Sequence, residues 1–340
     1  MRAIVYTAAG GPEVIALREV PTPEPGPGQI RVRVGASALN RADILQRKGA
    51  YPAPSGWPTD IPGLEYAGAI EALGTGVTRW RVGEGVMGLV GGGAHAEFVV
   101  VGEQEAVPVP PGMIWRDAAA IPEAFFTAYD ALSTRARVAG GEGVLIHAAA
   151  SGVGTAAIQL AKVMGATVTG TSRTKAKLEQ LHELGLDAGI DTSKRPFRDQ
   201  IVLPVHVILD VLGGPAFADN LAVLSPRGRL VLLGFLQGPV APDANLDVIL
   251  RKRLEVIGTV MRTRGPEERA ALAAEFRDRV LPRFGAHVRT DLPMQSMGTP
   301  VRSDPTLKPV VHAIFPMTDA RAAHEAMERN EGVGKIVLAW

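Results

Sequence analysis

The apolar residues of this chain are organised around one uncharged run, Gly143 to Ala161. Residues 144–147 have β character, residues 148–154 form a turn of small residues, and a helical apolar pattern follows at residues 156–161. The pattern predicts a strand, a tight turn and a helix. The run is about as long as a membrane span, but glycine, serine and histidine interrupt it. A strand–helix unit buried against a sheet needs this apolar character, so we expect no membrane segment here.

The residues before this unit have the short alternating pattern of β strands. Ile30 to Val34 alternates apolar and basic residues, as a half-exposed strand does. The other strands expected in this part are residues 1–6, 67–73, 85–90 and 96–101. Short strands flanked by glycine at this spacing indicate a compact, barrel-like domain, and a helical pattern follows at residues 113–131.

Strand and helix patterns alternate from residue 144 to about residue 261. Besides the first strand, strands are expected at residues 166–171, 205–210, 229–234 and 254–260. This alternation is typical of a mostly parallel sheet. A last strand is expected at residues 335–338, after helix and loop patterns. The simplest architecture is a β domain that is split around an inserted dinucleotide-binding domain.

Composition narrows the class of protein. The chain has 340 residues, 46% hydrophobic and 21% charged, which is typical of an ordinary soluble protein with two domains. Its 36 basic and 35 acidic residues give a net charge of +1, so neither nucleic acid nor an anionic membrane is expected as a partner. No targeting segment is expected. The absence of cysteine excludes disulfides, a thiol nucleophile and cysteine-ligated zinc, and favours a location in the cytoplasm.

The small-residue turn is a candidate phosphate-binding site. A turn between a strand and a helix start directs free backbone N–H groups and the positive end of the helix dipole toward an anion. The predicted cofactor contacts in this turn are Ala149, Ser151, Gly152, Val153 and Gly154. The two glycines allow close approach, and the serine takes the place of the usual middle glycine. The alternative is a strand–helix connection that binds no ligand.

The end of the second strand favours NADPH as the cofactor. NAD-binding proteins usually place Asp or Glu about twenty residues past the turn, whereas this chain has Thr171, Ser172 and Arg173, followed by Lys175 and Lys177. Hydroxyl, guanidinium and ammonium groups bind a 2′-phosphate through charge-assisted hydrogen bonds. We therefore predict that Ser172, Arg173 and Lys177 bind this phosphate. Alternatively, these side chains belong to the solvated first turn of a helix and bind no ligand. That alternative explains Lys175 more readily than Ser172 or Arg173.

Several longer motifs, in the same order along the chain, give a family resemblance. They are ASALNRADILQRKGAY at residues 36–51, IPGLEYAG at 61–68, AAAIPEAFFTAYDAL at 118–132, LIHAAASGVGTAAIQLAK at 145–162 and GKIVL at 334–338. With these motifs the chain resembles the zinc-free quinone oxidoreductase branch of the medium-chain dehydrogenase/reductase superfamily, and most closely the p53-inducible quinone oxidoreductase group. Residues 286–305 match least and look like an insertion or a divergent loop.

The resemblance implies a fold, which we adopt as the expectation. A Rossmann domain with a doubly wound parallel sheet, at residues 122–261, is inserted in a GroES-like β-barrel catalytic domain, at residues 1–121 and 262–340. Zinc-dependent members carry a metal-binding Cys near the position of Asn40 and a Gly-His-Glu where this chain has Gly63, Leu64 and Glu65. The seven histidines show no metal-ligand spacing, and His95 and His147 are expected to be structural.

Metal-free hydride transfer from NADPH to a quinone fits these features, because a quinone carries its own conjugated electron sink. The resemblance implies Tyr51 and Asn40 as catalytic hydrogen-bond donors and Thr127 beside the nicotinamide. Asn40 could instead be a turn or cap residue. The carboxyl edge of the sheet adds Val211, Gly234 and Phe235 as cofactor contacts, whereas Asp210 could merely cap a turn. The C-terminal motif adds Asn330 and Lys335.

Two other functions stay open at this point. An NADPH-dependent reductase of 2-enoyl or enone substrates needs the same hydride donor with a differently shaped site. A cofactor-binding regulatory protein or RNA binder with little turnover is the other option, although the even charge balance disfavours RNA.

Residues 254–261 are expected to be an edge strand through which two chains pair as a homodimer. An unpaired apolar edge is an aggregation hazard. Alternatively, residues 286–305 cover that edge.

Overall fold

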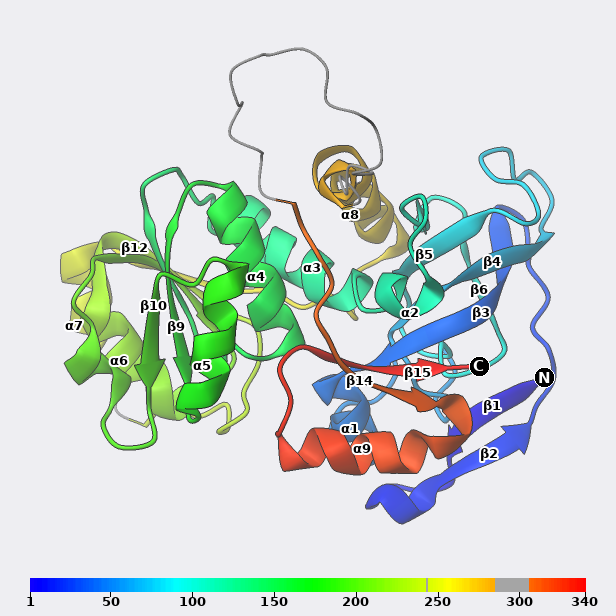
Figure 1. Ribbon diagram of the computed structural model, residues 1–340, viewed down its shortest axis with the longest axis horizontal. Helices are drawn as coiled ribbons and strands as arrows, with labels where there is room; N and C mark the ends of the chain where they lie inside the picture. The colour runs from blue at the N-terminus through cyan, green and yellow to red at the C-terminus, as the bar shows by residue number, and fades with distance from the viewer. Residues whose placement is uncertain (243, 285–305) are drawn as a thin grey trace, which may run out of the picture.

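A computed structural model describes residues 1–242, 244–284 and 306–340. Within these residues the strands form a six-stranded sheet, a seven-stranded sheet and a two-stranded ribbon. The two larger sheets lie side by side, the six-stranded one at the left of Figure 1 and the seven-stranded one at the right. No helix among the described residues is long and apolar enough to cross a membrane.

The six-stranded sheet is parallel throughout, in the order β10-β9-β8-β11-β12-β13. Its strands are β8 (Gly143–Ile146), β9 (Thr167–Ser172), β10 (Ala188–Asp191), β11 (Val205–Asp210), β12 (Leu224–Leu232) and β13 (Glu255–Gly258). Its helices are α4 (Gly152–Val163), α5 (Lys175–Leu181), α6 (Gly214–Val223) and α7 (Leu246–Lys252).

Both faces of this sheet are covered, because successive side chains of a strand point to opposite sides. Val144 and Ile146 of β8 join the core that contains residues of α4 and α5. Leu145, between them, packs in a second core with residues of α6 and α7. The strands therefore need apolar residues at every position, as the uncharged run predicts. The predicted doubly wound α/β fold is confirmed.

The seven-stranded sheet has the order β14-β15-β3-β4-β5-β7, and β6 pairs with β3. Its strands are β3 (Gln29–Leu39), β4 (Glu65–Leu73), β5 (Gly85–Leu89), β6 (Phe98–Gly102), β7 (Val107–Pro108), β14 (Val311–Pro316) and β15 (Lys335–Ala339). The ribbon consists of β1 (Arg2–Tyr6) and β2 (Ile15–Glu19). The helices of this part are α1 (Arg41–Arg47), α2 (Trp115–Ala118) and α9 (Ala320–Arg329).

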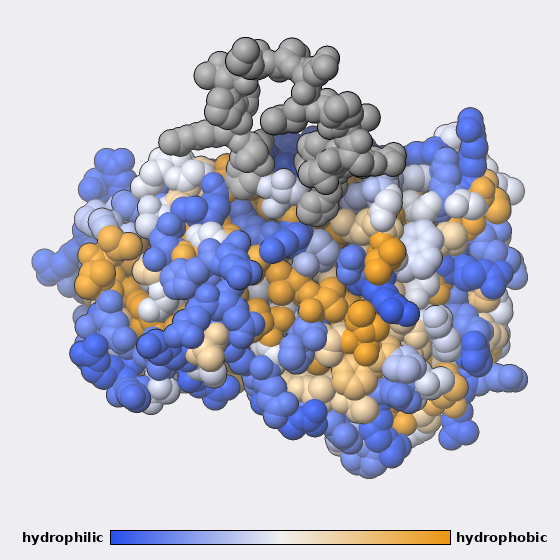
Figure 2. Space-filling model, viewed as in Figure 1, coloured by the Kyte–Doolittle hydropathy of each residue, from blue (hydrophilic) through white to orange (hydrophobic). Residues whose placement is uncertain are grey.

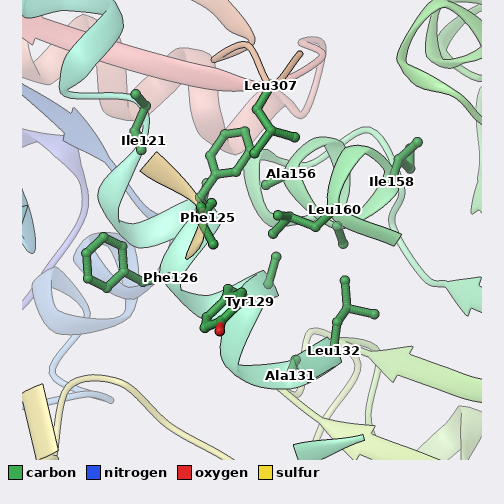
Figure 3. Close-up of a cluster of buried hydrophobic side chains, with 14 of the residues drawn as sticks. Ile121, Phe125, Phe126, Tyr129, Ala131, Leu132, Ala156, Ile158, Leu160 and Leu307 are labelled. Atoms are coloured by element: carbon green, nitrogen blue, oxygen red, sulfur yellow. The ribbon is translucent and has the colours of Figure 1, made fainter. Parts of the chain in front are cut away.

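Two helices lie between the sheets. Helix α3 (Pro122–Tyr129) continues as a π-helical segment, Asp130–Arg135, and packs against α8 (Pro266–Arg279). Phe126 of α3 stacks on Phe276 of α8 with ring centroids 4.1 Å apart, and Phe125 contacts Phe284 edge-on at 4.8 Å. Figure 3 shows Phe125 and Phe126 in this cluster. The two rings are therefore buried in the contact between α3, α8 and Phe284.

The strands of the six-stranded sheet all lie within residues 143–258, whereas those of the seven-stranded sheet come from both ends of the chain. From this separation we infer the predicted division into residues 122–261 and residues 1–121 with 262–340. Strand β13 lies at an edge of its sheet, as predicted, but is shorter than expected. Residues 286–305, predicted as a divergent loop, lie outside the described residues.

Candidate functional site

The turn before α4 has the geometry of an anion site. Ser151 is the N-cap of α4, and its hydroxyl accepts a hydrogen bond from the amide of Gly154 at 3.1 Å. The amides of Gly152 and Val153, in the first turn, have no acceptor within the helix. Ala149 is completely buried beneath this turn. The predicted turn residues are thus brought together around free amide groups at a helix N-terminus.

Both glycines of this turn are required by close packing. A Cβ on Gly154 would lie 2.5 Å from the carbonyl oxygen of Ala149. A Cβ on Gly152 would lie 2.4 Å from Cδ of Lys335, because the Lys335 side chain crosses the turn. Residue 334 is also bridged to the turn, since its amide donates to the carbonyl of Ala150 at 2.9 Å. The C-terminal strand is therefore joined directly to the start of α4.

Thr127 of α3 carries a buried hydroxyl group without a partner among the described residues. Its side chain is 9% exposed, and α3 packs against α4. A buried hydroxyl that stays unsatisfied costs free energy, so such a group commonly binds a ligand or an ordered water. This observation fits a nicotinamide dinucleotide laid across the end of the sheet, as expected for Thr127 from the sequence.

The residues predicted to bind a 2′-phosphate gather at the end of β9. The Ser172 hydroxyl accepts from the amide of Thr174 at 3.1 Å. Arg173 is exposed and has no hydrogen bond or ion pair with any described residue. The ammonium of Lys177 donates to the carbonyl of Asn330, which also accepts from Arg41 through its side chain. Burial, together with the charge of Arg173, lowers the pKa of Lys177.

Asn330 thus lies beside Lys177 of α5, although 153 residues separate the two along the chain. It is the C-cap of α9 and adopts a left-handed conformation with φ of 56°. That conformation is tolerated best by glycine and asparagine. The structure therefore places Asn330 as a link between α9 and Lys177, next to the predicted phosphate site.

The predicted contacts at the carboxyl edge of the sheet also come together. Strands β11 and β12 are parallel neighbours, and the amide of Leu236 donates to the carbonyl of Val211 at 2.9 Å. Phe235 follows Gly234 and is 52% exposed. The Asp210 carboxylate accepts from the amides of Leu212 and Gly213, so the turn-capping alternative holds for it. Burial raises the pKa of Asp210 to about 6.

Asn40 and Lys335 form a buried cluster with Glu65 instead of open donors. Asn40, the N-cap of α1, donates its side-chain amide to Glu65 Oε1 at 2.8 Å and to the carbonyl of Ala38 at 3.3 Å. Lys335 Nζ contacts Asn40 Oδ1 at 2.5 Å, Glu65 Oε1 at 2.8 Å and the carbonyl of Leu39 at 3.0 Å. Asn40, predicted as a catalytic donor, and Lys335, predicted as a cofactor contact, already have protein acceptors, so their geometry supports a positioning role.

Arg262, which is 6% exposed, contacts both the ring and the main chain of Tyr51. The guanidinium lies 5.0 Å from the centre of the Tyr51 ring and donates to the Tyr51 carbonyl at 2.9 Å. It also donates to Gln46 Oε1 at 2.5 Å and to the carbonyl of Gly91 at 2.9 Å. The Tyr51 hydroxyl has no hydrogen-bond partner among the described residues, so it remains available to a substrate. Burial raises its pKa, and the charge of Glu123 adds to this effect.

Sequence reasoning missed three residues of this site, which are Glu65, Glu123 and Arg262. Glu123 lies in the first turn of α3, and its amide donates to Glu65 Oε2 at 2.7 Å. An acidic residue in the otherwise apolar segment Ile121 to Ala128 was a signal that could have found it. Arg262 gave no comparable signal, because its burial depends on loops that are distant in the sequence.

His147 and His95, which were predicted as structural, are both buried. His147 is buried, with ring nitrogens 3.0 Å from Thr171 Oγ1 and 2.7 Å from Asn220 Oδ1. Burial lowers its pKa to about 4. His95 is completely buried and lies between β5 and β6 of the seven-stranded sheet. Among the described residues no group of three or more His, Cys, Asp or Glu side chains could hold a metal ion.

Two family models and a curated relative match this chain. A model described as "Alcohol dehydrogenase GroES-like domain" matches residues 26–111, and one described as "Zinc-binding dehydrogenase" matches residues 152–277. A quinone oxidoreductase of Pseudomonas aeruginosa is 33% identical over 350 residues, which cover 99% of both chains.

Two solved structures are similar over the whole chain. A mycobacterial protein solved in complex with NADPH is 28% identical with a TM-score of 0.83, and the match covers 100% of both chains. The CurK enoyl reductase is 27% identical with a TM-score of 0.81, and the match covers 99% of this chain and 98% of that one.

Proposed function

Because the chain belongs to the medium-chain dehydrogenase/reductase superfamily, in its quinone oxidoreductase branch, we propose that it is an NADPH-dependent quinone reductase. The observation that carries the proposal is the buried hydroxyl of Thr127, which has no partner in the described part of the chain and lies on a helix that packs against α4. A bound nicotinamide would satisfy this hydroxyl, and the free amides in the first turn of α4 would hold the pyrophosphate.

The cofactor is NADP(H), and the cations at the end of β9 account for the phosphate preference. Arg173 is exposed and unpaired among the described residues, and Ser172 and Lys177 flank it. A guanidinium can bind a phosphate through two parallel hydrogen bonds. No Asp or Glu occupies the end of β9, where a carboxylate would repel the phosphate. The similar mycobacterial structure with NADPH supports this assignment.

The residues present do not fit the zinc that one family description names. Leu64 stands where zinc-dependent relatives have histidine, and the Glu65 carboxylate is bound by Lys335, by Asn40 and by the amide of Glu123. The carboxylate of Asp43 accepts from the amides of Asn40 and Gly63. We therefore propose a mechanism that uses no metal.

In this mechanism the bound cofactor supplies the hydride, and the protein orients the substrate and stabilises the charge that forms on its oxygen. Tyr51 donates a hydrogen bond to that oxygen, since its hydroxyl has no competing partner among the described residues. Arg262 fixes the Tyr51 ring and main chain. The contacts within the Asn40–Glu65–Lys335 cluster hold these side chains in place beside the turn that begins α4.

A reductase of 2-enoyl or enone substrates is the second candidate, because the CurK enoyl reductase has the same fold over nearly the whole chain. Both substrates accept hydride and end with a charge on oxygen, so the site described here suits either. A panel of quinones and enones with NADPH and NADH separates the two. A protein that binds NADPH and reduces neither class would be a cofactor-binding regulatory protein.

We further propose a homodimer that forms through β13. This strand lies at an edge of its sheet, and Val256 and Val260 are 39% and 45% exposed. Pairing two such edges about a two-fold axis satisfies the backbone N–H and C=O groups and covers the apolar side chains. The cytoplasmic location stays a prediction from the absence of cysteine.

A further inference from the structure

The carboxyl group of Glu123 has no partner among the described residues, and the residue adjoins Glu65 of the candidate site. Glu123 occupies the first turn of α3, four residues before Thr127, so the two residues share one face of that helix. Its backbone amide is bound to Glu65, but its carboxyl group has no hydrogen bond or ion pair with any described residue. Glu123 is only half-buried, so water or a substrate can reach this carboxyl group.

The charged and titratable groups around Glu123 come from five different segments. Glu65 of β4 and Asp43 of α1 are negative, and Lys335 of β15 and Arg262 are positive. The fifth segment contributes Tyr51, whose pKa is raised by the charge of Glu123. Among these charges Glu65 acts most strongly on Glu123, and the opposing effect of Lys335 comes next, ahead of Asp43 and Arg262. Lys335 is itself paired with Glu65 at 2.8 Å.

This environment keeps the Glu123 carboxyl protonated near neutral pH. Burial raises the pKa of Glu123 to about 8, and the negative charge of Glu65 contributes to the rise. Tyr51 is a weaker acid, because burial raises its pKa above the usual value of about 10. Of the two groups that could give a proton to the substrate, Glu123 is therefore the one able to release it.

We propose that Glu123 is the general acid of the reaction and protonates the substrate oxygen. This inference rests on the proposed quinone reductase function. Reduction of a quinone by two electrons adds one hydride and one proton. The quinone gains the hydride that the nicotinamide gives up, and its oxygen becomes negatively charged. A new O–H bond then forms on that oxygen as the O–H bond of Glu123 breaks, and the electron pair stays on the Glu123 carboxylate.

The proton transfer is downhill for a quinone substrate. A phenolate oxygen has a proton affinity like that of tyrosinate, with a pKa of about 10, whereas the Glu123 carboxyl releases its proton at about 8. Solvent protonates Glu123 again, because the side chain is only half-buried. Tyr51 then acts as a hydrogen-bond donor that stays protonated, and Glu123 as the group that gives up its proton.

The experiment compares the wild type with Glu123→Gln, which keeps the shape of the side chain but has no acidic proton. Turnover of quinones and enones with NADPH is measured between pH 5.5 and 9.5. Wild-type kcat should fall as the pH rises through about 8, because the acid is then ionised. Glu123→Gln should lose roughly 10²-fold in kcat below pH 8 and should not show this fall. The affinity for NADPH should be unchanged.

A matched control and a readout without turnover complete the test. Glu19→Gln removes an exposed carboxylate at the end of β2 and should leave kcat and its pH profile unchanged. Infrared titration of the protein without substrate should show a protonated carboxyl band that disappears near pH 8 and is absent in Glu123→Gln. Glu123→Asp, which keeps the acid on a shorter side chain, should restore part of the activity.

The outcomes separate this inference from the function on which it rests. If the wild type reduces an acceptor and Glu123→Gln reduces it at the same rate with the same pH profile, Glu123 is not the acid, although the reductase function stands. If the wild type reduces no acceptor with either cofactor, the function and the inference both fail. A flattened pH profile together with loss of the infrared band supports the inference.

Discussion

The ammonium of Lys335 lies 2.8 Å from the carboxylate of Glu65, and both side chains are almost completely buried, 5% and 0% exposed. Lys335 begins β15 and Glu65 begins β4, while the methylenes of Lys335 cross Gly152 at the start of α4. The pair therefore joins the dinucleotide turn of one sheet to the strands of the other.

Lys335→Met should destabilise the protein by about 3–5 kcal/mol, because it leaves the Glu65 carboxylate buried without its counter-ion. The double variant Lys335→Met/Glu65→Gln should recover part of this loss, since it removes the stranded charge. Urea unfolding measures both. As a control, Arg251→Met breaks the exposed pair with Asp247 and should cost no more than about 1 kcal/mol. Equal losses for the buried and the exposed pair would contradict the assignment.

Cofactor preference depends on Arg173. NADPH should bind at least about tenfold more tightly than NADH, a ratio that needs only about 1.4 kcal/mol or one charge-assisted hydrogen bond. Arg173→Ala should weaken NADPH binding and leave NADH binding nearly unchanged, because the side chain has no partner among the described residues that its loss would disturb. Fluorescence titration with both cofactors measures the ratio. Equal affinity of the wild type for the two cofactors would refute the phosphate site.

Tyr51→Phe should lower quinone kcat more than it weakens NADPH binding, since the hydroxyl acts on charge that forms only during transfer. A loss of roughly 10-fold or more corresponds to one hydrogen bond to a charged oxygen. The ring and its contact with Arg262 remain, so stability should change little. Steady-state kinetics with a fixed quinone gives kcat, and titration gives the affinity. A variant with wild-type kcat would show that the Tyr51 hydroxyl takes no part in catalysis and that the ring only lines the site.

The dimer can be tested at β13. Val256→Glu places a charge on the exposed edge strand and should convert a dimer to monomer at micromolar concentration, because two like charges then meet across the two-fold axis. Light scattering measures the mass. Val202→Glu, at a residue that is 88% exposed outside the sheet, is the control and should leave the mass unchanged. A wild type that is already a monomer would rule out the dimer.

Local patterns predicted most of the Rossmann domain. Strand β11 has the predicted bounds, since five of the six residues from Val205 to Asp210 are apolar or histidine and the strand is buried on both faces. Strand β10, Ala188–Asp191, was missed, because a four-residue strand with a glycine has no period to detect. Figure 2 shows apolar residues gathered in the middle of the visible face, an arrangement that depends on tertiary contacts and that no local pattern reports.

Only the part of the candidate site that has a local pattern in the sequence could be predicted. The turn before α4 has a local signature, so Ser151 and Gly154 could be predicted as cofactor contacts from the sequence alone. Asn40 was predicted as a catalytic donor and Lys335 as a cofactor contact, but both side chains are bound to Glu65, which comes from a different strand. Glu123 was missed because an acid in the first turn of a helix is expected from the helix dipole and needs no further explanation.

The central claim is tested most directly by the oxidation of NADPH in the presence of ortho- and para-quinones, with enones as the competing class and with a metal chelator present throughout. The account predicts steady turnover of quinones that the chelator does not reduce, with kcat/KM for NADPH at least about tenfold higher than for NADH. Turnover that stops in the chelator and returns with zinc, or reduction of enones with no turnover of any quinone, would contradict it.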